Sequence, residues 1–301
     1  HYVQADKPAE KADATISVKG GLFYSDPTAF VAEGYAVVKD EDTYTVTTLA
    51  EAITNGANVI LPNGTYELTS LPINDKTFSL TGESKDGVII QHLAGGDSNY
   101  GGYTANVTFN NLTFKNDTSA YGDILANKVT YNECIYIGTM VTYSHEVYAN
   151  HTDFVPAASE YYNVHIYGEG ITKFYDCSFT TTASRSVYAH AESAKEMNIT
   201  FDNCTFKTLT QLPAGEWRFH PAIRLHTESP SDIYGTLTIK DTEIIGENTF
   251  GNTYNDGLWV EWNNSTKERT SNFKTTVDGV DVTYVRDYTF NEAYNTYFVY
   301  T

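Results

Sequence analysis

A short frame recurs along this chain of 301 residues, and it constrains the fold more than any other feature. Each copy consists of an alternating strand-like stretch, two polar turn residues, a small residue and a second strand-like stretch. Three copies each contain one of the three cysteines, and the others align on them. The copies are NVTFNNLTF (106–114), YNECIY (131–136), EVYANHTDF (146–154), FYDCSF (174–179), FDNCTF (201–206), LTIKDTEI (237–244) and TTVDGVDV (275–282).

The spacing between copies is irregular. Counted at the last strand residue before the turn, successive copies are 22, 18, 25, 27, 38 and 38 residues apart. A solenoid with variable loops produces this pattern, because each coil returns to the same stack while its loops lengthen freely. We therefore expect every copy to be one rung of a stack of strands. The counted residues are Phe109, Tyr131, Ala149, Phe174, Phe201, Ile239 and Val277.

The cysteine position of the frame holds small or medium residues that suit an apolar environment. In order they are Leu112, Cys134, Thr152, Cys177, Cys204, Thr242 and Val280. A buried thiol behaves as a small hydrophobic side chain, so we expect the cysteines to stack in the core. The alternatives are a zinc site and a disulfide. The chain has no C-x-x-C spacing, and three cysteines leave one unpaired.

The composition favours strands, and the net charge disfavours some classes of binding partner. The 24 Tyr and 15 Phe fit a pleated sheet surface. A net charge of −19 opposes binding to nucleic acid and to anionic lipid. No stretch approaches the roughly 18 apolar residues of a membrane span, so we expect no membrane insertion. The chain starts at His1, and we expect it to be a processed form or an excised piece.

The stretch TLAEAITNGANVILPNGTYEL, from Thr48 to Leu68, adds a family resemblance. Thr48 and Glu51 form a capping-box pattern, and Gly56 suits a helix end, which together predict a short helix. With the repeat frame, this stretch resembles the pectate-lyase-like superfamily over residues 47–284. The resemblance implies an all-β, single-stranded right-handed parallel β-helix with a short N-terminal capping helix, which we assign to residues 47–301.

Residues 1–46 lie outside that repeat. The stretch ISVKGGLFYSDPTAFVAEGYAVVKDEDTYTV (16–46) resembles a segment found in surface proteins of Gram-positive gut bacteria. The resemblance implies an extracellular or cell-wall-attached protein, of which this chain is one part. We therefore expect two units, 1–46 and 47–301.

Four strand-like stretches alternate inward apolar residues with unusual outward ones. They are NVHIYG from Asn163, SVYAHAE from Ser186, AIRLHTE from Ala222 and GLWVEW from Gly257. If they stack, their outward residues form two rows with a spacing of about 4.8 Å between rungs. We define these rows as the ligand strip: His165, Tyr188, Arg224 and Trp259, and Tyr167, His190, His226 and Glu261.

The ligand strip suggests a saccharide groove that binds a polysaccharide or a host or cell-surface glycan, in a module that serves adhesion or display. Aromatic rings stack on sugars, while charged and imidazole groups bind hydroxyls. Cross-rung pairing for stability is the alternative explanation of the aromatics. The long segment 209–221 is expected to wall this groove. The predicted ligand-binding residues are His165, Tyr167, Tyr188, Trp217, Arg218, His220 and Trp259.

Two other functions remain open. One is a polysaccharide lyase or glycoside hydrolase, with Arg224, His226, His190 and Glu261 as its candidate catalytic residues. A glycosidase needs two carboxyl groups about 5 to 9.5 Å apart, and β-helical lyases hold Ca²⁺ in carboxylate clusters. The strip has one carboxylate, Glu261, so we expect no cofactor, with Ca²⁺ as an alternative, and no metal site. The other is a structural stalk without a ligand.

Overall fold

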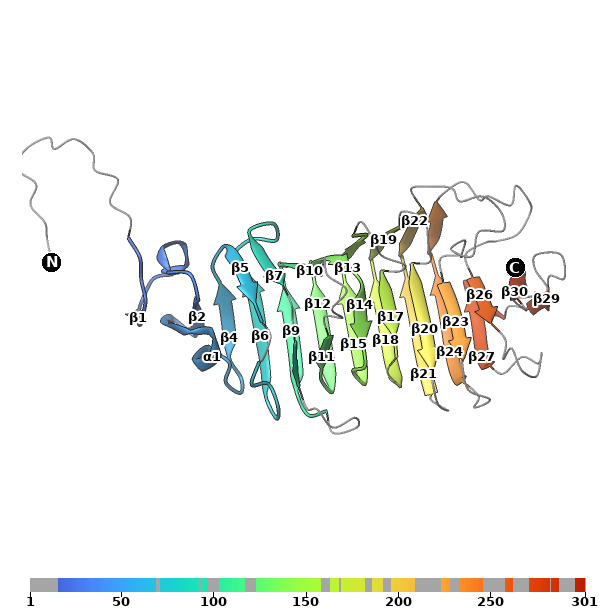
Figure 1. Ribbon diagram of the computed structural model, residues 1–301, viewed down its shortest axis with the longest axis horizontal. Coiled ribbons are helices and arrows are strands. Elements are labelled where there is room, and N and C mark those ends of the chain that lie inside the picture. The colour runs from blue at the N-terminus through green and yellow to red at the C-terminus, as the bar shows by residue number, and fades with distance from the viewer. Residues whose placement is uncertain are drawn as a thin grey trace, which may run out of the picture.

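The protein is a solenoid of stacked parallel strands. The computed structural model describes residues 16–68, 71–91, 94–96, 103–116, 123–157, 163–167, 169–181, 186–191, 196–208, 223–227, 233–245, 258–261, 271–281, 283–286 and 296–300. Strands of successive coils lie side by side along the long axis of the molecule, from the blue N-terminal end to the red C-terminal end (Figure 1). This arrangement confirms the predicted β-helix architecture.

Each complete coil visits three sheets in turn. The long sheet contains, in spatial order, β1 (Gly21–Phe23), β3 (Thr43–Thr48), β2 (Tyr35–Asp40), β4 (Asn58–Leu61), β6 (Thr77–Gly82), β9 (Asn106–Asn110), β12 (Lys128–Asn132), β15 (Glu146–Asn150), β18 (Gly170–Tyr175), β21 (Glu196–Asp202), β24 (Ile233–Lys240), β27 (Ser271–Val277) and β28 (Val280–Asp281). The second sheet contains β5 (Gly64–Glu67), β7 (Val88–Gln91), β10 (Thr113–Asn116), β13 (Ile135–Gly138), β16 (Asp153–Val155), β19 (Ser178–Thr181), β22 (Thr205–Thr208) and β25 (Glu243–Ile245).

The third sheet carries the ligand strip. It contains β14 (Met140–Thr142), β17 (Val164–Ile166), β20 (Val187–Ala191), β23 (Ile223–Thr227), β26 (Leu258–Glu261), β30 (Thr296–Tyr300) and β29 (Thr283–Arg286). β8 (Ala94–Gly96) and β11 (Asp123–Leu125) form a separate parallel pair. β14 to β26 run parallel, whereas β30 pairs antiparallel with both β26 and β29.

The register of the long sheet follows the repeat frame. Phe109 pairs with Tyr131, Tyr131 with Ala149, and the alignment continues through Phe174, Phe201, Ile239 and Val277. The residue two positions later has φ between 46° and 53° in six of these coils, a left-handed conformation that Asn and Asp tolerate best. These residues are Asn111, Glu133, His151, Asp176, Asn203 and Asp241.

The cysteine position is buried from Leu112 to Cys204, as predicted, and all three thiols are free. The structure adds a reason for the choice of residue. The Cys134 thiol donates to the carbonyl of Asn132 at 3.3 Å, and the Thr152 hydroxyl donates to the carbonyl of Asn150 at 3.2 Å. Cys177, Cys204 and Thr242 make the same contact with the residue two positions earlier. This position therefore favours a short side chain that donates a hydrogen bond and fits the core.

The last copy of the frame departs from the prediction. Asp278 and Gly279 both have positive φ, 48° and 80°, and Val280 pairs antiparallel with Val277. Val280 is 68% exposed instead of buried. Asp-Gly favours a two-residue hairpin turn, so the chain reverses here instead of continuing around the coil.

Two columns of stacked rings fill the interior. On the second sheet, Phe179 stacks on Phe154 with a centroid distance of 4.8 Å and on Phe206 at 4.6 Å. On the long sheet, Phe174 stacks on Phe201 at 5.0 Å. Rings of the two columns meet edge to face, for example Phe174 and Phe179 at 5.2 Å. Stacking along the axis and edge contacts across it pack the core of successive coils together.

The N-terminal segment extends the long sheet. β2 pairs antiparallel with β3 and with β4, while β1 pairs antiparallel with β3. Ala36 of β2 is fully buried within the main core. The 3-10 turn η1 (Thr28–Phe30) lies between β1 and β2. The boundary placed at residue 46 stays a prediction.

One helical turn, α1 (Leu49–Ala52), lies where the sequence predicts a short helix. The Thr48 amide donates to the Glu51 carboxylate at 3.4 Å, and the Thr48 hydroxyl donates to it at 2.8 Å. α1 packs against β2 and β3, and its capping of the first coil stays a prediction. Among the described residues, none of the helices is both long and apolar enough to cross a bilayer.

Candidate ligand-binding strip

The third sheet aligns the ligand strip along the solenoid axis. His165 pairs with Tyr188, Tyr188 with Arg224, and Arg224 with Trp259, which makes one row across four coils. In the second row, His190 pairs with His226. Tyr167 directly follows β17 and Glu261 is the last residue of β26, and both continue this row at its two ends. The backbone thus brings the eight predicted residues together, and their role in binding stays a prediction.

Strand alternation explains why these residues share a face. Val164 and Ile166 belong to the hydrophobic core, with exposures of 0% and 1%. His165 lies between them and therefore points to the opposite side of the sheet. Val187 and Ala189 flank Tyr188 in the same way.

The first row is less accessible than we expect from sequence. His165 is 2% exposed and Tyr188 is 8% exposed. Their ring centroids lie 4.6 Å apart, and the His165 ring lies 3.9 Å from that of Tyr167. The rings of His165 and Tyr188 are therefore buried against neighbouring aromatics, and their role in binding stays a prediction.

Tyr143 joins the strip, and the sequence analysis missed it. The rings of Tyr143 and Tyr167 lie 4.9 Å apart and are nearly parallel, with an interplanar angle of 2°. The signal was present: Met140–Tyr143 aligns with Val164–Tyr167, because Met140 pairs with Val164 in the sheet. Both tyrosines are half-buried. Their mutual stacking covers one face of each ring.

The C-terminal half of the strip is described at the level of the backbone. β23 and β26 place Arg224, His226, Trp259 and Glu261, and β20 places His190. The side chains of these five residues lie outside the described part. Trp217, Arg218 and His220, predicted to wall the groove, lie outside the described residues altogether.

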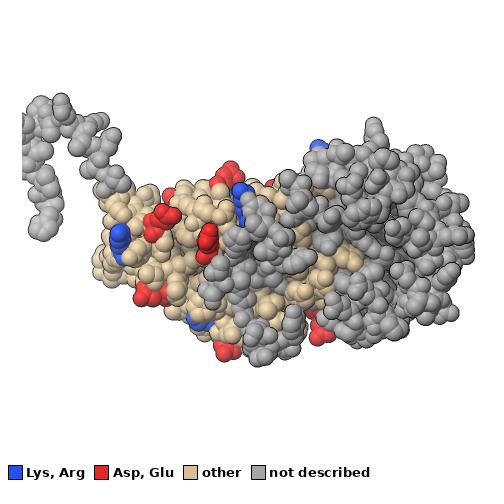
Figure 2. All heavy atoms as spheres, in the orientation of Figure 1, with Lys and Arg blue, Asp and Glu red and all other residues tan. Residues whose placement is uncertain are grey.

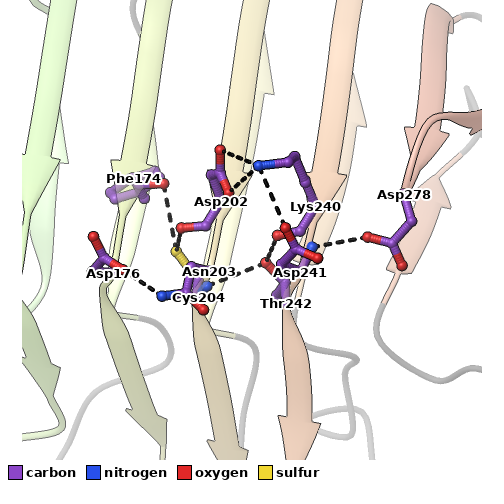
Figure 3. A network of polar contacts seen from close by, with 9 residues as sticks. All are labelled: Phe174, Asp176, Asp202, Asn203, Cys204, Lys240, Asp241, Thr242 and Asp278. Atoms are coloured by element: carbon purple, nitrogen blue, oxygen red, sulfur yellow. Dashed lines mark hydrogen bonds and ion pairs between the residues drawn. The ribbon is translucent and has the colours of Figure 1, made fainter.

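A polar network follows the turn between the long and second sheets (Figure 3). The Lys240 ammonium contacts both carboxylate oxygens of Asp202, at 3.0 and 3.1 Å, and Asp241 at 3.4 Å. The pKa of Lys240 is raised, first by the hydrogen bond that it donates to Asp202 and then by the one that it donates to Asp241. The Asp278 carboxylate accepts the Asp241 amide at 2.8 Å, and Asp176 accepts the side-chain amide of Asn203.

The carboxylates of Asp176, Asp202, Asp241 and Asp278 each contact a group of the protein itself. Within the described part of the chain, no group of three or more His, Cys, Asp or Glu side chains is arranged to hold a metal ion. On the face shown in Figure 2, acidic side chains of the described residues are scattered over the surface and do not gather in one patch. The hydrolase or lyase alternative stays a prediction, because its four candidate side chains lie outside the described part.

Comparison with protein-family models, with curated proteins and with solved structures finds no match for this chain. The class is therefore defined by the fold itself. The chain is a β-helix-like solenoid, nearly all β, with stacked parallel sheets and an aligned row of His165, Tyr188, Arg224 and Trp259 in the third sheet.

Proposed function

We propose that this protein is a β-helical module that binds a glycan through the C-terminal half of the ligand strip. The main observation behind this proposal is that Tyr188, Arg224 and Trp259 are neighbours on successive coils. Tryptophan and arginine at neighbouring positions of a sheet combine a flat apolar ring with several hydrogen-bond donors, which suits a sugar ring and its hydroxyls. His165 and Tyr188 support the row from buried positions.

Charge narrows the glycan class. The chain carries 38 acidic against 19 basic residues, which disfavours a polyanionic glycan unless local basic groups reverse the field. A neutral oligosaccharide or polysaccharide is therefore the proposed ligand. We place the module in an extracellular or wall-attached protein of the pectate-lyase-like superfamily from a Gram-positive bacterium, where it serves adhesion or display. Support for this placement comes from the resemblances of residues 16–46 and 47–284.

A glycan array tests this proposal. Trp259→Ala is expected to weaken binding at least about tenfold, as expected for loss of a central aromatic contact. Thr236→Ala, an exposed change on the long sheet, provides a matched control that should bind like wild type. Tyr188→Ala should lower the melting temperature in addition to weakening glycan binding, because the Tyr188 ring is buried. Equal binding by wild type and Trp259→Ala, or no binding across the array, would contradict the proposal.

A structural stalk is the second candidate, and the stacked rings favour it. Phe154, Phe179 and Phe206 form a continuous stack over three coils, and a column of this kind stiffens a solenoid without a ligand. Small-angle scattering of the folded protein, together with an array on which it binds nothing, would support the stalk. A glycan hit that Trp259→Ala removes would reject it.

A further inference from the structure

Two of the three free cysteines are direct neighbours on adjacent coils. β19 and β22 pair in register, with Ser178 opposite Thr205, and the Thr205 amide donates to the Cys177 carbonyl at 2.9 Å. Cys177 and Cys204 directly precede these residues and share the same frame position. Paired strands lie about 4.8 Å apart, which falls within the Cα separation of disulfides, about 4.4 to 6.8 Å. The backbone therefore already holds the pair at a bridging distance.

The two thiols also lie close enough to affect each other's titration. Their mutual interaction raises the pKa of Cys177 and lowers that of Cys204. Both side chains are buried, with exposures of 2% and 1%. Each thiol also donates to the carbonyl two residues earlier, Cys177 to Tyr175 and Cys204 to Asp202, so the two sulfurs have equivalent surroundings.

We propose that Cys177 and Cys204 form an oxidative modification site, at which a peroxide converts the thiol pair into a disulfide between adjacent coils. In the first step one of the two sulfurs attacks one peroxide oxygen, the O–O bond breaks, and a sulfenic acid and water form. In the second step the other thiol sulfur attacks the sulfenic acid sulfur, the S–O bond breaks, and a second water leaves. Two thiols are oxidised by two electrons in total, and one hydrogen peroxide is reduced to two waters.

Cys134 provides an internal contrast. It occupies the same column and is equally buried, but its neighbours in the column are Leu112 and Thr152. Burial raises the pKa of Cys134 to about 12. Without a thiol on the next coil, Cys134 has no partner for a bridge, so the pairing should be selective for Cys177 and Cys204.

The bridge would tie two coils together. Cys177 and Cys204 are 27 residues apart in the sequence (204 − 177), and a link across that loop restricts the unfolded chain more than the folded one. Oxidation should therefore raise the melting temperature. This inference concerns the core and is independent of the ligand strip.

The test is exposure of the full chain to dilute hydrogen peroxide just below its unfolding transition, where coils open locally. Three variants replace cysteine by threonine, the residue that the column carries at 152 and 242. Wild type and Cys134→Thr should each lose two hydrogen atoms in mass, with a peptide that links Cys177 to Cys204 and a raised melting temperature. Cys177→Thr and Cys204→Thr should keep their remaining thiols or gain oxygen, without a bridge.

Two results would overturn the proposal. One is three intact thiols in wild type after exposure, measured after denaturation. The other is a bridge that includes Cys134, or a bridge that persists in Cys177→Thr. A Cys→Thr variant that fails to fold is replaced in the comparison by cysteine-to-alanine at the same position.

Discussion

The side-chain amide of Asn132 donates a hydrogen bond of 2.8 Å to the side-chain carbonyl of Asn110 on the preceding coil. Asn150 donates an equal bond of 2.8 Å to Asn132, and Asn110 donates to the Thr81 hydroxyl at 3.1 Å. A carboxamide side chain has an acceptor oxygen on one side and a donor NH2 group on the other. In-register parallel strands therefore let each asparagine donate to the preceding coil and accept from the following one. This asparagine ladder ties four coils together on the outer face of the long sheet.

Asn132→Ala should lower the free energy of unfolding by about 1 to 3 kcal/mol, because it leaves two half-buried partners, Asn110 and Asn150, without their bonds. Thr130→Ala, on the same face of β12, is the matched control and should stay within about 0.5 kcal/mol of wild type. Urea denaturation measures both. Equal effects of the two variants would mean that the ladder adds nothing to stability.

Phe179→Ala should lower the free energy of unfolding by about 3 to 5 kcal/mol, the range for deleting a buried aromatic ring. Phe179 is fully buried and contacts Phe154, Phe174, Phe201 and Phe206. Phe179→Leu keeps an apolar group in the space and should cost less. Chemical denaturation of both variants gives the comparison, and a loss below about 1 kcal/mol for Phe179→Ala would show that the stack closes around the cavity.

The repeat frame was enough to predict the long-sheet register, because a strand residue, a left-handed turn residue and a buried small residue each have local preferences. The pairing of Phe174 with Phe201 and the burial of Cys177 follow from that frame. The hairpin at Asp278-Gly279 also has a local signal, the Asp-Gly dipeptide. The repeat frame alone predicts a further coil at this point.

Exposure on the ligand strip could not be predicted in the same way. Alternation places His165 on the outer side of its sheet, and the side chain is nevertheless 2% exposed. Alternation gives the direction of a side chain but says nothing of what packs over it. That depends on contacts between segments distant in the sequence, such as the approach of Tyr188 to His165, and a pattern within one strand carries no information about them.

Stability should depend on pH through Cys134. Its pKa is raised by burial from 9.0 to about 12, so the folded state holds its proton where the unfolded state loses it. This contribution is fully present below pH 9 and is lost as the pH rises towards 12. The loss is about 1.4 kcal/mol per pH unit across that window.

Cys134→Thr isolates this effect, since every other titrating group is common to both proteins. The difference in unfolding free energy between wild type and Cys134→Thr should be constant from pH 7 to 8 and should shift against wild type above pH 9. Urea denaturation at successive pH values gives the difference. A difference that is independent of pH up to 11 would show that the Cys134 thiol titrates alike in both states.

Gly235 is the position where an added methyl group should do most harm. Its φ is 142°, and a Cβ there would lie 2.0 Å from the carbonyl oxygen of Met197 on the neighbouring strand β21. That oxygen belongs to the backbone of a paired strand, so neither side can move without breaking the pairing of β24 with β21. Gly235→Ala should therefore cost more than about 2 kcal/mol.

Gly34→Ala is the matched control, because Gly34 also has a positive φ, 82°, but nothing lies within 4 Å of an added Cβ. It should cost about 1 kcal/mol, the backbone penalty alone. Thermal unfolding of the two variants separates the clash from the backbone penalty. If Gly235→Ala is no less stable than Gly34→Ala, then β21 and β24 are not held as closely as their register requires.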